Sequence, residues 1–439
     1  MNKKSRTDQL QLILDDLIPR LSDSEYVENI LNKNKNYNYS TLDKYSLCKG
    51  FPSLCILFSE LHMLYPDKGY DIIRDNYFAN VFEYFKVHQD DSLSMVQGLT
   101  GIGLSAECMS YNGDIKNFIN KFNDLLLIKV NALLTRLKDK EYVEELFYDI
   151  MYGVSGVANY CMLFPESSKM MNILNDIVQY LVDICKDKQI RGAVVPGCIV
   201  DNFSSPFRLV NKVDQCYFNL GLSHGIPGIL LVLVNAYKLG IHIEGQLDTI
   251  KKLSDLIKKC IVTKSENGQY WKSSLTLDEY ISNILTEEEK YRDAWCYGSP
   301  GVSFSILVTG MFLNDNQLTD IAIDNMKISL ERKRNVSSMT FCHGLSGLMY
   351  LSFKFYEFTH IECFKHYYLE LMDLILDSYD VNIPFGFKNH EIIGDIDDVG
   401  ILTGTTGILL CLLSLIHGNQ TPWDAAFSLY SVDTRIRLK

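Results

Sequence analysis

Gly298-Ser299-Pro300-Gly301 is one of six copies of a G-x-x-G motif in this 439-residue chain. The other five copies begin at Gly98, Gly153, Gly225, Gly344 and Gly404. A seventh, degenerate copy is Gly50-Phe51-Pro52-Ser53, in which serine stands for the second glycine. The first glycines of successive copies are 48, 55, 72, 73, 46 and 60 residues apart. This period indicates an array of one supersecondary unit, with extra material in the middle of the chain.

Two kinds of helical segment alternate in the array. The segments that follow the motifs are apolar nearly all round, as in 302–312 and 408–416, whereas those between are two-faced, as in 115–126 and 173–184. A helix that is apolar on every side must be enclosed by others, and a two-faced helix lies outside, facing water. The pattern predicts an all-α fold, an α/α toroid of seven inner and seven outer helices.

The domain organisation expected from this pattern is a single toroid domain over residues 1–439. Residues 187–220 interrupt the helical rhythm with a strand-and-turn composition that includes Ala193-Val194-Val195-Pro196-Gly197 and Ser204-Ser205-Pro206. We interpret 187–220 as a small β-containing insertion. A plain long loop is the alternative.

Composition and charge limit the classes of binding partner and indicate the cellular compartment. The net charge is −12, so an extended polyanion such as nucleic acid is a poor partner and a cationic peptide is a better one. The 12 cysteines are scattered, and the sequence begins Met1-Asn2-Lys3-Lys4 with no apolar signal segment behind it. Both features favour the cytoplasm, where thiols stay reduced.

The residue before the first glycine of each copy is polar or has a polar tip. In a ring, all inner helices would start at the same end, so their N-termini would crowd one central basin. Polar side chains at equivalent points of that basin are typical of a shared active site. The seven residues are Lys49, Gln97, Tyr152, His224, Tyr297, His343 and Thr403.

Two of these loops also carry potential metal ligands. Cys296 and Cys342 each lie two residues before a first glycine, and His343 follows Cys342 directly. Two thiolates and an imidazole are the ligands expected of a zinc ion whose fourth position is left for water or substrate. We therefore predict one catalytic Zn²⁺ per chain, held by Cys296, Cys342 and His343. Cys48 also lies two residues before a first glycine, but it is two repeats away around the ring. We expect it to be buried without metal.

Three blocks of the sequence resemble the signatures of LanC-type lanthipeptide cyclases. They are Gly221-Leu222-Ser223-His224-Gly225-Ile226-Pro227-Gly228, Arg292-Asp293-Ala294-Trp295-Cys296-Tyr297-Gly298 and Cys342-His343-Gly344. The resemblance covers essentially the full length. It implies a zinc-dependent toroidal enzyme that adds cysteine thiols of a dehydrated lantibiotic precursor peptide to its dehydroalanine and dehydrobutyrine residues. This intramolecular Michael-type addition forms lanthionine and methyllanthionine rings.

The resemblance also implies roles for single residues and for partners. The family's zinc ligands fall on Cys296, Cys342 and His343, in agreement with the prediction from the residues themselves. Its catalytic residues fall on His224, Asp149, Arg292 and Tyr297. The insertion at 187–220 would contact the leader segment of the precursor. A complex with a lanthipeptide dehydratase and an exporter, at the inner face of a bacterial membrane, is a further implication.

The chemistry fits these residue types. A peptide cysteine with a pKa near 8.5 is mostly a thiol in the cytosol, and zinc would hold it as a thiolate. Attack on the dehydro residue builds an enolate, which needs a proton at the α-carbon and stabilisation on oxygen. His224 could supply the proton, Asp149 could orient it, and Arg292 could help hold the enolate. The simpler alternatives are that Asp149 caps a helix and that Arg292 and Tyr297 hold their loop.

Two other classes of function remain open. A glycosidase on a helical toroid would need paired carboxylates in the basin, and the pre-glycine positions hold none. A non-catalytic, zinc-containing LanC-like protein that binds thiols or peptides could keep the same metal ligands. A neighbouring gene for a dehydratase would favour the cyclase over this binding protein.

Overall fold

The computed structural model describes most of the chain. The described residues are 5–88, 92–110, 115–140, 142–201, 205, 216–264, 268–288, 291–333, 336–391 and 393–430. The chain divides into two compact units. Unit 1 takes residues 1–92, 96–120 and 336–423, and unit 2 takes residues 93–95, 121–335 and 424–439. The single domain expected over residues 1–439 stays a prediction.

Every glycine motif is followed by a helix that begins one residue after its first glycine. In the described part of unit 1 these helices are α4 (Phe51–Leu64), α6 (Leu99–Met109), α16 (Leu345–Thr359) and α18 (Thr405–His417). In the described part of unit 2 they are α9 (Val154–Cys161), α11 (Ile226–Lys238) and α14 (Ser299–Leu313). The expectation that each motif starts a buried helix is confirmed. In α18, every residue from Thr405 to Ser414 is buried.

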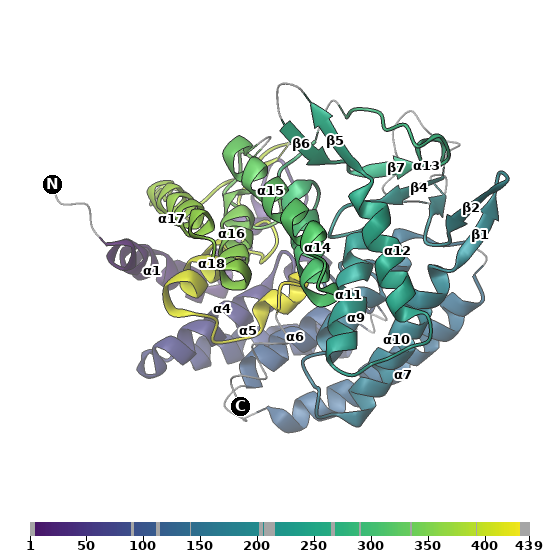
Figure 1. Ribbon diagram of the computed structural model, residues 1–439. Coiled ribbons are helices and arrows are strands. Elements are labelled where there is room, and N and C mark those ends of the chain that lie inside the picture. The colour runs from purple at the N-terminus through teal and green to yellow at the C-terminus, as the bar shows by residue number, and fades with distance from the viewer. Residues whose placement is uncertain are drawn as a thin grey trace. The chain divides into compact units, whose positions relative to one another are not determined.

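Within unit 1 the motif helices form a row covered by two-faced helices. α16 packs on α18, α18 on α4, and α4 on α6. The covering helices are α5 (Tyr70–Val87), which packs on α4, and α17 (Glu362–Asp377), which packs on α16 (Figure 1). The remaining elements in the described part of the unit are α1 (Arg6–Ser22), α2 (Ser24–Asn32), α3 (Thr41–Lys44), η1 (Pro66–Lys68), β8 (Asn389–Glu391) and β9 (Gly394–Ile396).

Unit 2 repeats this arrangement. α9 packs on α11 and α11 on α14. The covering helices are α10 (Ser168–Ile184) on α9 and α11, α12 (Gln246–Lys258) on α11, and α15 (Asn316–Arg332) on α14 (Figure 1). In α10 the buried residues Ile173, Ile177 and Leu181 are spaced four apart, so one face packs inward. The short helix α8 (Glu145–Tyr148) precedes α9, and α7 (Lys116–Lys138) and η3 (Trp423–Phe427) carry residues of both units.

Short strands interrupt the helices of unit 2. β1 (Asp187–Ile190) and β2 (Ala193–Pro196) form an antiparallel hairpin (Figure 1). β3 (Val200–Asp201), β4 (Cys216–Asn219) and β7 (Ser274–Thr276) form a sheet in the order β3-β4-β7, followed by α13 (Leu277–Ser282). The β-containing insertion expected at 187–220 is therefore present, although its residues 202–204 and 206–215 lie outside the described part. β5 (Ile261–Lys264) and β6 (Gly268–Trp271) form a second hairpin, which the sequence patterns did not predict.

The loops that enter neighbouring motif helices are joined by backbone hydrogen bonds. In unit 1 the bonds connect the residues that lie two positions before a first glycine. Cys342 N donates to Leu402 O at 2.9 Å, and Leu402 N donates to Cys48 O at 3.4 Å. Cys48 N in turn donates to Val96 O at 3.0 Å. Equivalent loops therefore lie side by side, as the repeat predicts.

The same connection holds within unit 2. Ile150 N donates to Ser223 O at 3.1 Å, and Ser223 N donates to Cys296 O at 3.3 Å. The loops before α9, α11 and α14 are thus linked in that order. The link places the loop of His224 directly beside the loop of Cys296.

The second glycine of a motif allows a close approach between a helix and its own entry loop. A Cβ added at Gly301 would lie 2.1 Å from Trp295 O, and one added at Gly347 would lie 1.9 Å from Phe341 O. Gly298 has a further constraint, because its φ of 98° falls where side chains are strained. These positions require glycine for steric reasons, which explains why the motif recurs.

No helix in the described part of the chain combines the length and the apolar character needed to cross a bilayer.

Candidate active site

His224 and Asp149 form a hydrogen-bonded pair in unit 2. His224 Nδ1 lies 2.5 Å from Asp149 Oδ2, and the Asp149 side chain is fully buried. Since a carboxylate only accepts hydrogen bonds, Nδ1 is the donor, and Nε2 is the nitrogen that can exchange a proton. The structure therefore brings His224 and Asp149 together, whereas their predicted roles in catalysis stay predictions.

Asp149 also holds the loop that enters α9. Its Oδ1 accepts hydrogen bonds from Tyr152 N at 2.6 Å and from Gly153 N at 2.7 Å, at the start of α9. One carboxylate oxygen thus holds the helix entry and the other holds His224. The helix cap that was the simpler alternative is not formed, because the N-cap residue of α9 is Gly153 and no side chain caps it. The hydrogen bonds to the entry loop nevertheless fix the carboxylate in place.

Two tyrosine rings flank the imidazole of His224. The ring of Tyr152 is nearly parallel to it, with centroids 6.0 Å apart and an interplanar angle of 13°. The ring of Tyr297 is tilted by 36°, with centroids 6.1 Å apart. Tyr297 was predicted as a site residue, and the structure brings it together with His224 and Asp149.

The hydroxyl of Tyr297 is held by a residue that the sequence patterns missed. Asn219, at the end of β4, donates from Nδ2 to Tyr297 Oη at 3.0 Å. Burial raises the pKa of Tyr297 well above its usual value, so the phenol stays protonated at neutral pH. Asn219 lies two residues before the block that carries His224, but its partner is 78 positions away in sequence.

Cys296 lies on the loop next to His224. Its side chain is 7% exposed, and its carbonyl oxygen accepts hydrogen bonds from Ser223 N at 3.3 Å and Ser223 Oγ at 3.2 Å. Arg292, four residues earlier on this loop, is half-buried. The role predicted for Arg292 in the chemistry stays a prediction.

Cys342 and His343 belong to unit 1, where both side chains are partly exposed. His343 Nε2 lies 2.8 Å from Glu391 Oε1, and His343 Nδ1 lies 3.5 Å from Thr340 Oγ1. Glu391 is the last residue of β8, and its Oε1 also accepts from Asn389 Nδ2 at 3.1 Å. No sequence pattern pointed to Glu391 as a neighbour of His343.

The ligand set predicted for zinc is divided between the units, with Cys296 in unit 2 and the other two residues in unit 1. Within the described ranges, no three His, Cys, Asp or Glu side chains are grouped so as to hold a metal ion. The donor chemistry still suits zinc, because two thiols and an imidazole are its preferred ligands. The zinc site therefore stays a prediction.

Cys48 provides the comparison within unit 1. Its side chain is 4% exposed, and its Sγ lies 3.4 Å from Ser46 Oγ. Burial raises the pKa of the Cys48 thiol to about 12. Cys48 is thus buried, as expected, and remains a thiol at neutral pH.

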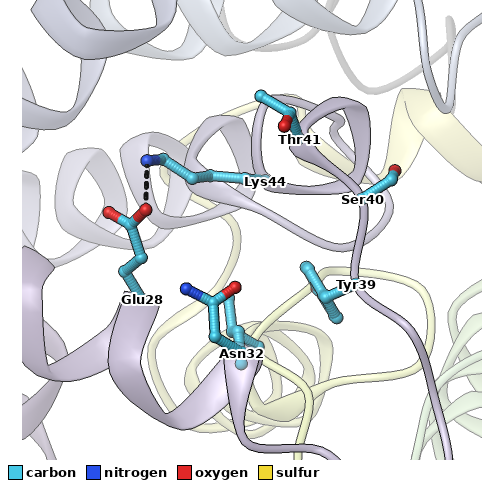
Figure 2. Close-up of a pocket in the computed structure, with 7 residues that line it drawn as sticks. Glu28, Asn32, Tyr39, Ser40, Thr41 and Lys44 are labelled. Atoms are coloured by element: carbon cyan, nitrogen blue, oxygen red, sulfur yellow. Dashed lines mark ion pairs between the residues drawn. The ribbon is translucent and has the colours of Figure 1, made fainter.

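A small cavity of about 90 Å³ lies elsewhere in unit 1, between α2 and α3. Figure 2 shows that Glu28 and Lys44 point toward each other across it, and their side chains form an ion pair of 2.8 Å. None of the predicted site residues lines it. The lining residues are Glu28, Leu31, Asn32, Tyr39, Ser40, Thr41 and Lys44.

Comparisons with known proteins agree with this geometry. Nisin biosynthesis protein NisC of Lactococcus lactis subsp. lactis is 24% identical over 438 residues, which cover 98% of this chain and 97% of that protein. The solved structure of a nisin cyclase superposes with a TM-score of 0.81 at 22% identity, over 96% of this chain and 98% of that one. The structural likeness confirms the expected fold class, the all-α α/α toroid with a small β-containing insertion.

The family comparison confirms the resemblance noted in the sequence. The sequence model described as "Lanthionine synthetase C-like protein" matches residues 41–428, which include all seven glycine motifs. The chain therefore belongs to the lanthionine synthetase C-like protein family.

Proposed function

We propose that this protein is a zinc-dependent cyclase that closes thioether rings in a dehydrated lantibiotic precursor peptide. The reaction is the addition of cysteine thiols to dehydroalanine and dehydrobutyrine residues of the same peptide, which forms lanthionine and methyllanthionine. Family membership and the likeness to NisC and nisin cyclase support a lanthionine-forming enzyme. The observation that carries the proposal is the His224–Asp149 pair, on a loop hydrogen-bonded to the loop of Cys296.

Cys296, Cys342 and His343 would hold the zinc ion. When bound, zinc would keep the sulfur of a peptide cysteine as a nucleophilic thiolate. The contact between His343 Nε2 and Glu391 supports this assignment. Metal-bound histidines commonly donate their second ring N–H to a carboxylate, which orients the ring.

His224 would protonate the α-carbon after the sulfur has added to the β-carbon. In this step the carbon–carbon π pair shifts to the bond between the α-carbon and the carbonyl carbon, and the carbonyl π pair moves to its oxygen. The resulting enolate takes its proton at the α-carbon. Asp149 would hold the imidazole in one tautomer through Nδ1. Arg292 would help hold the enolate. Because the cysteine loses one proton and the α-carbon gains one, the peptide mass does not change.

The partner implied by this reaction is a precursor peptide with a leader and a core segment. The insertion at 187–220 would contact the leader, and the net charge of −12 suits a cationic peptide. A lanthipeptide dehydratase would supply the dehydro residues, and an exporter would remove the product, in a complex at the inner face of a bacterial membrane.

The alternative is a non-catalytic LanC-like protein that binds thiols or peptides through the same metal. The His224–Asp149 pair favours the cyclase over this alternative. Holding a thiol or a peptide needs no group that transfers a proton, whereas ring closure does.

The proposal is tested by incubating the zinc-loaded protein with a dehydrated candidate precursor and then alkylating the remaining thiols. Ring closure leaves the peptide mass unchanged and removes one alkylatable thiol for each ring. The expected result is loss of alkylation beyond that seen in peptide incubated without protein. Alkylation equal to that control, with tight peptide binding, would support the binding protein instead.

A further inference from the structure

Asn219 has a fixed amide orientation, because both ends of the amide are occupied. Its Oδ1 accepts a hydrogen bond from Gly221 N at 3.0 Å, which identifies that atom as the oxygen. Its Nδ2 therefore faces Tyr297 Oη at 3.0 Å and Glu145 Oε1 at 3.4 Å. With 2% of its surface exposed, Asn219 cannot exchange these partners for water.

Glu145 is a second partner that agrees with this orientation of the Asn219 amide. Its side chain is fully buried at the start of α8, and its Oε1 accepts a hydrogen bond from the hydroxyl of Tyr217 as well as the contact from Asn219. Oε2 is buried with no hydrogen-bond partner among the described residues. Since Oδ1 faces Gly221 N, the amide hydrogens of Asn219 point the other way, toward Glu145 and Tyr297.

The direction of the Tyr297 hydroxyl follows from these contacts. Its oxygen accepts from Asn219, so its own hydrogen points away from Asn219. The ring also lies beside His224, with centroids 6.1 Å apart. Tyr297 is thus oriented as a hydrogen-bond donor next to the acid/base residue.

We propose that Asn219 is a positioning residue that makes Tyr297 the hydrogen-bond donor to the carbonyl oxygen of the dehydro residue under attack. This inference rests on the proposed function. As the carbon–sulfur bond forms, the alkene π pair shifts toward the carbonyl carbon and the carbonyl π pair moves to that oxygen. Tyr297 donates a hydrogen bond to the oxygen and keeps its proton, and His224 delivers a proton to the α-carbon. A hydrogen-bond donor that already faces the oxygen on which charge develops does not have to reorient during the reaction.

A purely structural role for the same contacts would have different consequences. In that case Asn219 would only hold β4 against α8, and its loss would lower stability without changing the chemistry of Tyr297. The two roles are separated by a measurement on the Tyr297 hydroxyl itself. That measurement does not depend on ring closure, so it is decided even if the proposed function is wrong.

The first experiment places 3,5-difluorotyrosine at position 297 alone and follows its phenolate absorbance during a pH titration. Fluorination separates its signal from those of the other tyrosines. If Asn219 donates to this oxygen, Asn219→Ala removes a donor from the phenolate and raises the pKa of the fluorinated phenol. An unchanged or lower pKa overturns the inference. The same label at Tyr152 is the control, and its pKa should not respond to Asn219→Ala.

The second experiment measures ring closure in Tyr297→Phe, Asn219→Ala and the double variant, all loaded with zinc. Loss of one donor at a developing oxyanion costs roughly 10²–10³-fold in kcat, and we expect that loss for Tyr297→Phe with KM little changed. Asn219→Ala should lower kcat by about tenfold or more. The double variant should be no slower than Tyr297→Phe, because both changes remove one interaction. The inference is contradicted if the fold-losses in kcat of the two single variants multiply in the double variant. It is also contradicted if Asn219→Ala keeps the parental kcat.

Asn325→Ala provides a matched control for removing a buried asparagine. Asn325 is 1% exposed on the covering helix α15 and donates to Ile321 O at 3.0 Å. It should keep the parental kcat per folded molecule. If Asn219→Ala fails to fold, the isosteric Asn219→Asp replaces it in both experiments. A parent that closes no rings overturns the proposed function, while the titration still decides the hydrogen bond.

Discussion

Asp293 and Arg332 form a bidentate ion pair in unit 2, with Nη2–Oδ1 at 2.6 Å and Nε–Oδ2 at 2.9 Å. The Asp293 side chain is fully buried and that of Arg332 is 8% exposed. Asp293 lies three residues before Cys296, and Arg332 is the last residue of α15. The pair therefore fastens the cysteine loop to the helix that covers α14.

Removing one partner of this pair should destabilise the protein strongly. Asp293→Asn leaves a buried guanidinium without its counter-charge, and we expect a loss of about 3–5 kcal/mol in the free energy of unfolding. Urea unfolding monitored by circular dichroism measures it. The control is Asp373→Asn, which breaks a similar pair with Arg6 that is 29–38% exposed and should cost about 0–1 kcal/mol. Equal losses for the two variants would contradict the assigned role of Asp293.

Replacing His343 should remove the metal. The proposal gives zinc three protein ligands, and loss of one leaves two thiolates, which bind the ion much more weakly. Metal analysis of purified His343→Ala should find well below one zinc per chain. The control is Cys48→Ser, which alters a buried cysteine that also lies two residues before a first glycine. This variant should keep its zinc. Full retention of zinc in His343→Ala would refute the ligand set.

Glu391→Gln should have a smaller effect at the same site. The carboxylate that faces His343 Nε2 at 2.8 Å would orient the ring without touching the metal. Loss of such a partner typically weakens metal affinity by about 10–100-fold. Competition with a chelator of known affinity measures the change. An affinity equal to that of the parent would mean that Glu391 does not support a zinc ligand.

His224→Ala should separate metal binding from chemistry. We expect the parental zinc content and a ring-closure rate lower by about 10²–10⁴-fold, because a positioned general acid is lost. The assay counts alkylatable thiols on a dehydrated peptide over time. His390→Ala is a matched control, since His390 also faces an aspartate, Asp395, through Nδ1 at 2.6 Å but is 44% exposed. Unaltered ring closure in His224→Ala would remove His224 from the mechanism.

The ion pair of Lys272 and Glu279 should make part of the stability depend on pH. Burial alone would raise the pKa of Glu279, but Lys272 and hydrogen bonds from Thr286 and Thr276 lower it to about 2. The folded pKa thus lies below the unfolded value of about 4.3. The stabilisation is present above pH 4.3 and is lost as the pH falls from there through about 2.

The measurable consequence is a difference between the parent and Glu279→Gln. The parent should be more stable at pH 6, and this advantage should shrink by up to about 3 kcal/mol as the pH falls toward 2. Urea unfolding at pH 6, 4 and 3 measures it. A difference that stays constant over this range would show that Glu279 keeps an ordinary pKa in the folded protein.

Much of the fold could be predicted because it depends on residues close together in the sequence. Every motif helix begins one residue after a first glycine, and the steric reason is local. Gly301, for instance, must approach the carbonyl of Trp295, only six residues earlier. The sheet that joins β4 to β7 could not be predicted in this way. Its pairs, such as Tyr217 with Thr276, bring together residues 59 positions apart, and no repeat relates them.

The candidate site, like the fold, could be predicted from the sequence only in part. Polar residues in equivalent loop positions pointed to His224 and Tyr297, and the resemblance to a known family added Asp149. Their contacts, however, were not visible in any pattern. Asn219 and Glu391 were missed because each acts through a partner far away in the sequence, Tyr297 in one case and His343 in the other.

Where the buried helices start, and which residues stand at their entrances, could be predicted from the amino-acid sequence, because backbone sterics and hydrophobic periodicity act over a few residues. Which of those side chains meet, and which atom donates to which, depends on how the whole chain folds. Asp149 and His224, for example, meet because their loops are hydrogen-bonded neighbours. Hydrogen-bond direction is set by every group that surrounds an atom, and packing brings those groups from distant parts of the chain.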